Sequence, residues 1–326
     1  LKGGTTTFND MYHFFEATAR AARDSGIRAC PSEVLLSFLP DARERMERAF
    51  RQAREWKGGA DGRVRPMFAP HATYSVSEGM MREVVEEAKR QGLRVHIHLA
   101  ETANEVEQSR AHTGRSPVQV AAEQGAFEPG ALAAHCVHVS DGDVAILAEG
   151  RVGVSHNPTS NLKLASGFAP VAKMLAQGVT VGLGTDGAAS NNNLDMWEEL
   201  RLAAIMHKAV TGDPTVLPAA QALRLATLGG AEALGLEKEI GSLEPGKKAD
   251  IVLIDLRQPH LTPLFEPISH LVYCARADDV HTVIVNGEVL VDEGRCVRLD
   301  EAEIMAKGAE HARALLKRVE EGQTGR

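Results

Sequence analysis

The segment from Val95 to Thr102, VHIHLAET, holds two histidines and a glutamate at a spacing that suits metal chemistry. On a β-strand, alternation places His96 and His98 on one face, and Glu101 follows just past the strand end. A histidine at a strand terminus with a carboxylate three residues later can bind a metal ion and place a proton-transfer group beside it. We interpret His98 and Glu101 in this way, and His96 as a buried, hydrogen-bonded side chain.

Polar side chains of the same kinds end other predicted strands. Considered alone, His135 in AAHCVH is more often a core histidine, and Asp186 in GTDG is more often a turn or helix-capping aspartate. The small residues after Asp186, however, leave room for a ligand near the backbone, and its carboxylate is free to bind a metal or accept a proton. His156, in VSHNPTSNLKL, either contacts a substrate or supports a turn. The recurrence at strand ends is the informative pattern, and its members are Asp10, His71, His98, His135, His156 and Asp186.

These residues need a scaffold that brings successive strand ends together. Short β-rich runs alternate with amphipathic helical stretches such as 78–91, which is typical of parallel strands with crossover helices. An open doubly wound sheet would carry a GxGxxG loop, which the sequence lacks. We therefore predict an α/β fold, a (β/α)8 barrel with polar residues at the carboxyl ends of its strands. Only seven strands are predicted, and we expect the missing first strand to precede residue 1; the seven runs are 5–10, 27–30, 64–69, 94–99, 131–136, 152–156 and 179–184.

The pattern changes after two further helical stretches, at 194–209 and 217–234. Turn-punctuated β runs follow in GSLEPGKKADIVLIDL and HTVIVNGEVLVDEGR, and they predict a small separate sheet. We divide the chain into a barrel carrying strands 2 to 8 (1–236), part of a small β-sandwich (237–300), and a C-terminal helix and tail (301–326).

Charge and cysteine content narrow the choice of partners and compartment. The chain has 36 Lys and Arg against 44 Asp and Glu, a net charge of −8, and no basic run. Because binding to phosphate groups needs clustered basic side chains, we expect a small-molecule partner and neither nucleic acid nor membrane. Four scattered cysteines, no long apolar stretch and no signal peptide favour the cytoplasm. Cys136, flanked by apolar residues, is expected to pack rather than to react.

Taken together, the motifs resemble the amidohydrolase superfamily, and within it the 5'-methylthioadenosine/S-adenosylhomocysteine deaminases and their chlorohydrolase relatives. The likeness covers essentially the whole chain and is specific to the superfamily, less so to the subgroup. The matching segments are APHATYS (69–75), HIHLAET, AAHCVH, SHNPTSNLKL, LGTDGAASNNNLDMWEELRLA (183–203) and GSLEPGKKADIVLIDL (241–256).

The resemblance implies a role for each residue at the predicted strand ends. His98 matches a metal ligand, Glu101 the proton shuttle to a ring nitrogen, and His135 the group facing the attacking water. Asp186 matches both a metal ligand and the base, and His71, Glu101 and Asp186 match substrate contacts. The implied reaction is hydrolytic deamination of an adenine nucleoside with one divalent metal, zinc ahead of iron. Family members also suggest a homo-oligomer.

The chain departs from the family pattern in two places. An HxH pair on the first barrel strand, which would supply two further metal ligands, is absent, so we expect either an incomplete chain or a catalytically dead partial barrel serving as a structural module. Glu33 stands where a family member can offer an arginine to the carboxylate of S-adenosylhomocysteine, and this argues against that substrate. A guanine-type or triazine deaminase or chlorohydrolase remains the alternative activity, although the presence of Asp186 favours deamination.

Overall fold

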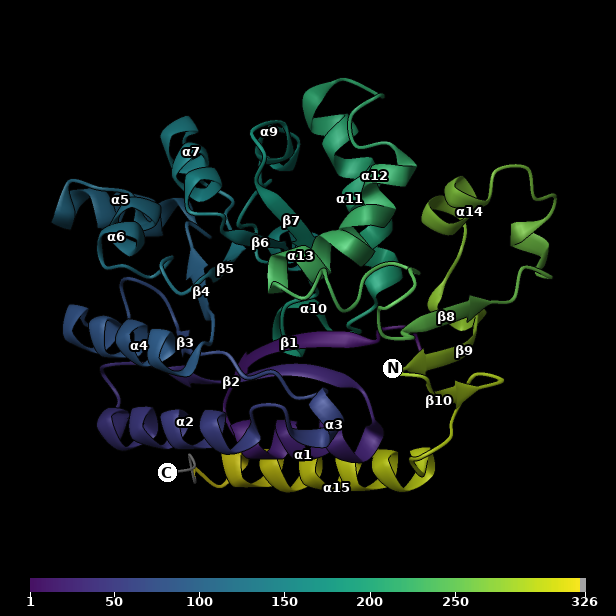
Figure 1. Ribbon diagram of the computed structural model, residues 1–326, viewed down its shortest axis with the longest axis horizontal. Coiled ribbons are helices and arrows are strands. Elements are labelled where there is room, and N and C mark those ends of the chain that lie inside the picture. Colours follow the sequence, from purple (N-terminus) through teal and green to yellow (C-terminus); the bar gives the residue numbers. More distant parts are fainter. Residues whose placement is uncertain (323–326) are drawn as a thin grey trace.

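Seven parallel strands lie between residues 7 and 183 of the computed structural model, which describes residues 1–322 (Figure 1). Each predicted β-run contains a strand or a parallel bridge. The third is the most altered, because only its last residue joins β3, while Val64 pairs singly with Ala29. Pro66, which has no backbone N–H to donate, lies between those two points. The strands are β1 (Thr7–Tyr12), β2 (Arg28–Leu35), β3 (Ala69–Pro70), β4 (Val95–Leu99), β5 (Ala131–His135), β6 (Gly153–His156) and β7 (Thr180–Leu183).

The strands follow one another around an arc in sequence order. Hydrogen bonds join β1 to β3 in one sheet and β4 to β7 in another. Parallel bridges at Phe68–Val95 and Ala72–His98 connect the two sheets across β3 and β4. This is the barrel arrangement predicted from the sequence, and it brings all the carboxyl strand ends to one side. Within residues 1–322, β1 and β7 each have a single strand neighbour.

Helices cover the outer face of the arc and bury its apolar side chains. In α4, Met81, Val84, Val85 and Ala88 are buried, and the helix spans Glu78–Gln91 as the periodicity predicts. Gly92 ends it with φ 60°, a left-handed conformation that glycine adopts readily. The other helices of this region are α1 (Phe15–Ser25), α2 (Ala42–Trp56), α3 (Gly59–Gly62), α5 (Ala103–Thr113), α6 (Pro117–Glu123), α7 (Asp141–Glu149), α8 (Pro158–Lys163), α9 (Val171–Ala176), α10 (Ala188–Asn191), α11 (Met196–Thr211), α12 (Ala219–Arg224), the π-helical turn η1 (Leu225–Gly229) and α13 (Gly230–Leu234).

The C-terminal region forms an antiparallel sheet in the order β11-β10-β9-β8, confirming the predicted change of architecture. Asn286 and Gly287, both with positive φ, make the tight turn between β9 and β10. A buried ion pair between Arg28 of β2 and Asp250 ties this region to the strands of the arc. Its elements are β8 (Ile251–Ile254), η2 (Pro259–Leu261), α14 (Pro267–Tyr273), η3 (Ala277–Asp279), β9 (Val280–Val285), β10 (Glu288–Asp292), β11 (Arg295–Cys296) and α15 (Glu301–Glu320).

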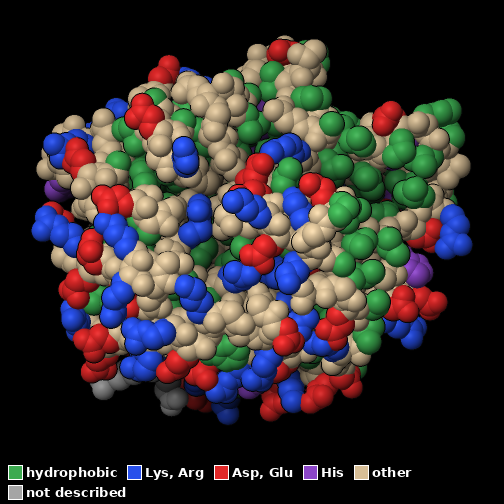
Figure 2. All heavy atoms as spheres, in the orientation of Figure 1, with side chains coloured by type: hydrophobic (Ala, Val, Ile, Leu, Met, Phe, Trp, Pro, Cys, Tyr) green, Lys and Arg blue, Asp and Glu red, His purple; other side chains and the backbone are tan. Residues whose placement is uncertain are grey.

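The surface is mixed in charge. Figure 2 shows acidic and basic side chains interspersed over the lower face, while apolar side chains gather toward α14 and the antiparallel sheet. This face therefore offers no extended basic stripe of the kind that a nucleic-acid backbone needs. Among the described residues, no helix is both long and apolar enough to span a bilayer.

Candidate active site

His98 lies on β4 with its ring directed to the inner side of the arc. The alternate residues Val95, Ile97 and Leu99 pack outward into the main core. Nδ1 of His98 lies 2.9 Å from the carbonyl oxygen of His71, so Nδ1–H donates and the lone pair of Nε2 is left available. Burial, together with nearby His135 and His71, lowers the pKa of His98 to about 4. A neutral imidazole with a free Nε2 is the form that binds a metal ion.

His135 ends β5 and stacks on His98, with ring centroids 5.4 Å apart. Its backbone turns through φ 72°, a left-handed conformation that is uncommon for a residue with a side chain. Nδ1–H donates to the side-chain oxygen of Asn161 at 2.8 Å. This bond selects the tautomer in which Nε2 carries the lone pair, and Nε2 lies 3.9 Å from a carboxylate oxygen of Glu101.

Glu101 reaches this cluster from the turn after β4, and its side chain is 24% exposed. The hydroxyl of Ser166 lies 3.4 Å from its other carboxylate oxygen. The turn is held by Glu105, a buried carboxylate that accepts the backbone N–H groups of Ala100 and Glu101 at 3.0 and 2.7 Å. Glu105 therefore sets the direction from which Glu101 approaches His135.

Asp186 follows β7 with φ 62°. The Ser160 hydroxyl donates to one carboxylate oxygen at 2.6 Å, and the Gly187 N–H donates to the other at 2.6 Å. Burial raises the pKa of Asp186, but these two bonds and the nearby His135 and His98 outweigh burial and lower it. Asp186 is therefore ionised near neutral pH and can accept a proton or bind a cation.

His71 completes the cluster from the segment after β3. Its ring centroid lies 4.8 Å from that of His98, and its Nδ1 lies 2.9 Å from the hydroxyl of Ser75. Tyr74 stands edge-on to His71 at 5.9 Å and is largely exposed. Burial lowers the pKa of His71, so the ring is neutral at pH 7 and can donate or accept one hydrogen bond. The structure thus brings together His71, His98, Glu101, His135 and Asp186, the five side chains selected from the sequence.

Two other polar residues at strand ends point away from this cluster. Asp10 accepts a hydrogen bond from Thr18 of α1 at 3.2 Å, whereas its neighbour Asn9 faces inward and donates to Nδ1 of His96. His156 packs outward, with its Nε2 3.2 Å from Nε2 of His207 on α11. Alternation along the strand explains both, because each follows an inward-facing position. Of the two readings left open for His156, the structure favours support over substrate contact.

Glu33 also points outward, which removes the electrostatic argument built on it. Its carboxylate is buried against α1 and α2, where it pairs with Arg45 at 3.0 Å and Arg48 at 3.2 Å and accepts the N–H of Phe15. The two arginines therefore offset the negative charge of Glu33, and its carboxylate does not face the inner side of the arc. Cys136 is fully buried, and burial raises the pKa of its thiol, as expected for a packing residue.

Several side chains that orient the cluster were not selected from the sequence. Glu105 was detectable, since Thr102 and Glu105 form the T-x-x-E pattern of a helix start, and Thr102 does accept the N–H of Glu105. Asn161, Ser160 and Glu199 gave no such local signal, because each acts on a residue more than 20 positions away.

The cluster offers part of a metal donor set. Among residues 1–322, no three His, Cys, Asp or Glu side chains are grouped closely enough to hold a metal ion. His98 supplies a free imidazole nitrogen and Asp186 an ionised carboxylate, which are two of the donor types that zinc prefers. These two donor types suit part of a metal site, and the assignment of His98 and Asp186 as ligands remains a prediction.

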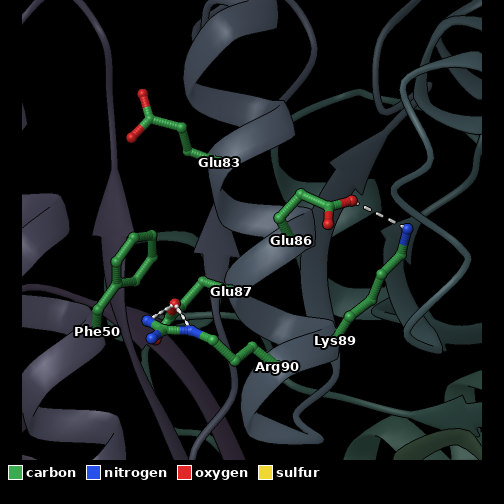
Figure 3. A pocket seen from close by; sticks show the side chains of 6 residues that line it. All are labelled: Phe50, Glu83, Glu86, Glu87, Lys89 and Arg90. Carbon is green, nitrogen blue, oxygen red and sulfur yellow. Dashed lines mark hydrogen bonds and ion pairs between the residues drawn. The ribbon is translucent and has the colours of Figure 1, made fainter.

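A surface hollow elsewhere contains none of these residues. It lies on the outside of the molecule between α2 and α4 and is lined by Phe50 and charged side chains of α4 (Figure 3). Ion pairs within it, such as Lys89 with Glu86 at 3.1 Å, satisfy much of its charge. We regard it as a solvated groove between helices.

The sequence and the arrangement of strands match a known family. The chain belongs to the amidohydrolase family, whose sequence model matches residues 1–290. It is 51% identical over 318 residues to a 5-methylthioadenosine/S-adenosylhomocysteine deaminase of Pelotomaculum thermopropionicum, covering 98% of this chain and 73% of the relative. It is 48% identical to a 5'-deoxyadenosine deaminase of Methanosarcina acetivorans, with 98% and 74% covered.

A solved structure shows the same likeness in three dimensions. An adenosine deaminase from Xanthomonas campestris with bound zinc superposes with a TM-score of 0.93 at 36% identity, covering 97% of this chain and 72% of that one. The family and the barrel fold predicted from the sequence are therefore confirmed.

Proposed function

We propose that the protein is a metal-dependent hydrolase that deaminates an adenine nucleoside. The observation that carries this proposal is the convergence of His98, His135, Glu101 and Asp186 at the ends of β4, β5 and β7, with both histidines held in the tautomer that frees Nε2. The relatives that are about half identical to this chain carry the names of deaminases acting on adenosine derivatives, which supports adenine as the base.

His98 and Asp186 would hold a divalent metal in this site, and we propose zinc ahead of iron. Imidazole and carboxylate donors suit either ion, so the donor types alone do not set this order. The zinc bound to the Xanthomonas deaminase supports it. A metal so placed acts as a Lewis acid and favours ionisation of water near neutral pH.

The side chains of this chain divide the proton transfers of the reaction. Water adds to the ring carbon that bears the amino group, the adjacent ring nitrogen gains a proton, and ammonia leaves. Asp186, ionised because its pKa is lowered, takes one proton from water and delivers it to the departing amino group. Glu101 gives a proton to the ring nitrogen and regains one from the added hydroxyl group as it becomes the carbonyl, and Nε2 of His135 accepts a hydrogen bond from the attacking water. His71, on the other side of His98, contacts the substrate.

The proposal covers adenine nucleosides with any of four groups at the 5' carbon of the ribose: methylthio, homocysteinyl, hydroxyl or hydrogen. Because Glu33 is paired with Arg45 and Arg48 and faces α1 and α2, it does not repel the carboxylate of S-adenosylhomocysteine. That substrate therefore belongs in the test beside 5'-methylthioadenosine, adenosine and 5'-deoxyadenosine.

The test is ammonia release by the protein, expressed at the full length that its gene encodes and loaded with zinc. We expect turnover of at least one of these four nucleosides, with formation of the matching inosine derivative. Absence of turnover with every aminopurine tested would refute the deaminase assignment.

Glu101→Gln tests the proton-transfer role directly. Gln keeps the shape of the side chain but cannot carry a proton, so we expect kcat to fall by about 10²- to 10⁴-fold while metal content is unchanged. Glu107→Gln, an exposed position on α5, is the matched control and should behave as the wild type. A fully active Glu101→Gln enzyme would contradict the role.

A further inference from the structure

Glu199 is a carboxylate that the proposed reaction does not use, and it is 0% exposed. It lies in the first turn of α11 and accepts two hydrogen bonds. The backbone N–H of Thr159 donates to one oxygen at 3.0 Å, and the side-chain amide of Asn191 donates to the other at 2.7 Å. Neither partner carries a charge, although burying a carboxylate costs free energy that a cation usually offsets. Such an arrangement points to a role other than stability.

Its two partners belong to the two segments that follow β6 and β7. Thr159 lies in the first turn of α8, whose capping residue Asn157 makes no side-chain cap of its own. Asn191 ends α10, and its side-chain oxygen accepts the N–H of Leu194. Glu199 therefore caps α8 from a distance and fixes α10 against it.

The helix that Glu199 anchors contacts two residues of the candidate active site. Ser160, next to Thr159, donates its hydroxyl to Asp186, and Asn161 accepts Nδ1–H of His135. Both Ser160 and Asn161 are fully buried, so neither can change partners without movement of α8. Displacement of α8 would thus alter the direction of Asp186 and the tautomer of His135 together.

We propose that Glu199 is a positioning residue that orients Asp186 and His135 through α8. The proposal rests on the function proposed above, since it assigns Glu199 to that same site. Its physical basis is that both partners of Glu199 are N–H donors, each facing a different carboxylate oxygen, so an amide at this position can satisfy only one of them.

The first variant is Glu199→Gln, which conserves size but turns one oxygen into an NH2 group. The new NH2 group then faces either the N–H of Thr159 or the side-chain amide of Asn191, which are both donors. That hydrogen bond is lost, and α8 or α10 must shift. Because a displacement of about 1 Å in an active site can cost 10²-fold, we expect kcat to fall by about that factor with KM little changed. Glu198→Gln, the same change at the adjacent exposed residue, is the control and should keep the wild-type kcat.

A second variant restores the lost hydrogen bond by exchanging the donor and the acceptor between positions 191 and 199. In the double variant Asn191→Asp/Glu199→Gln, the new amide can donate to the new carboxylate, which still accepts the N–H of Leu194, and the net charge is unchanged. We expect kcat to recover most of its loss. If kcat of the folded Glu199→Gln enzyme equals that of the wild type, or if the double variant regains stability without regaining kcat, Glu199 is structural only and the proposal is overturned.

A measurement independent of turnover separates this proposal from the proposed function. Nitrogen-15 spectra of histidine-labelled, full-length protein report which nitrogen of His135 is protonated. We expect the Nδ1–H tautomer in the wild type and in Glu198→Gln, and a mixture of tautomers in Glu199→Gln. An unchanged tautomer in Glu199→Gln would overturn the inference whether or not any nucleoside is deaminated, whereas an inactive wild type with the predicted tautomer shift would refute only the deaminase function.

Discussion

The histidine pair between β6 and α11 should make the fold sensitive to mild acid. His156 and His207 are both buried, and their Nε2 atoms are 3.2 Å apart. When both rings are neutral, one Nε2–H donates a hydrogen bond to the other Nε2. Burial lowers the pKa of His207 from 6.5 to about 4. As the pH falls from 6.5 toward 4, the unfolded chain therefore binds a proton at this residue that the folded chain does not.

The shift converts into a free energy of unfolding. With an unfolded pKa of 6.5 and a folded pKa of about 4, His207 alone removes about 2 kcal/mol of stability between pH 8 and pH 5. Stability from this residue is fully present above pH 6.5 and is lost as the pH falls. The assay is urea denaturation at both pH values for the wild type and for His207→Gln, which can still hydrogen-bond to His156.

His207→Gln should lose about 2 kcal/mol less stability than the wild type between pH 8 and pH 5. His112→Gln, which removes an exposed histidine of α5, should show the wild-type difference. An equal loss in His207→Gln and the wild type would show that this imidazole takes up its proton equally in both states, and the reasoning from burial would be wrong.

Three further substitutions test packing and the buried ion pair. Gly182→Ala would place a methyl group 2.7 Å from the backbone of Gly230, so we expect about 1–3 kcal/mol of destabilisation by urea denaturation; Gly79→Ala, in open space on α4, should instead stabilise by about 0.5–1 kcal/mol. Arg28→Met leaves the Asp250 carboxylate buried without its cation, which should cost about 3–5 kcal/mol, and a loss below about 1 kcal/mol would show that the pair is not essential to the sheet contact.

Periodicity located the seven strands, although β3 is much shorter than its predicted run, and the strand ends provided a set of candidate residues larger than the cluster. The alternation in VHIHLAET placed His98 on the inner face and left Glu101 beyond the strand, as found. It did not separate Asp10 and His156 from the cluster, because a position at a strand end does not tell which face the side chain takes. Asn9 shows how the distinction could be made, since its inward direction requires that Asp10 face α1.

The supporting residues escaped prediction for a different reason. Glu33 could be judged only once α1 and α2 were seen to surround it with Arg45 and Arg48. Glu199 contacts a residue 40 positions earlier, and nothing in the local sequence marks that pairing. Contacts of this kind depend on how helices pack over the strands, which composition and spacing do not encode.

The left-handed turns at the strand ends have a consequence for variation in this protein. His135 and Asp186 both occupy backbone conformations that glycine adopts freely and that cost other residues about 1–2 kcal/mol each. Random substitution and selection for heat resistance alone would therefore favour glycine at two positions where the proposed reaction needs an imidazole and a carboxylate. Laboratory stabilisation of this protein should keep these two residues unchanged, because the most heat-stable variants would otherwise be among the least active.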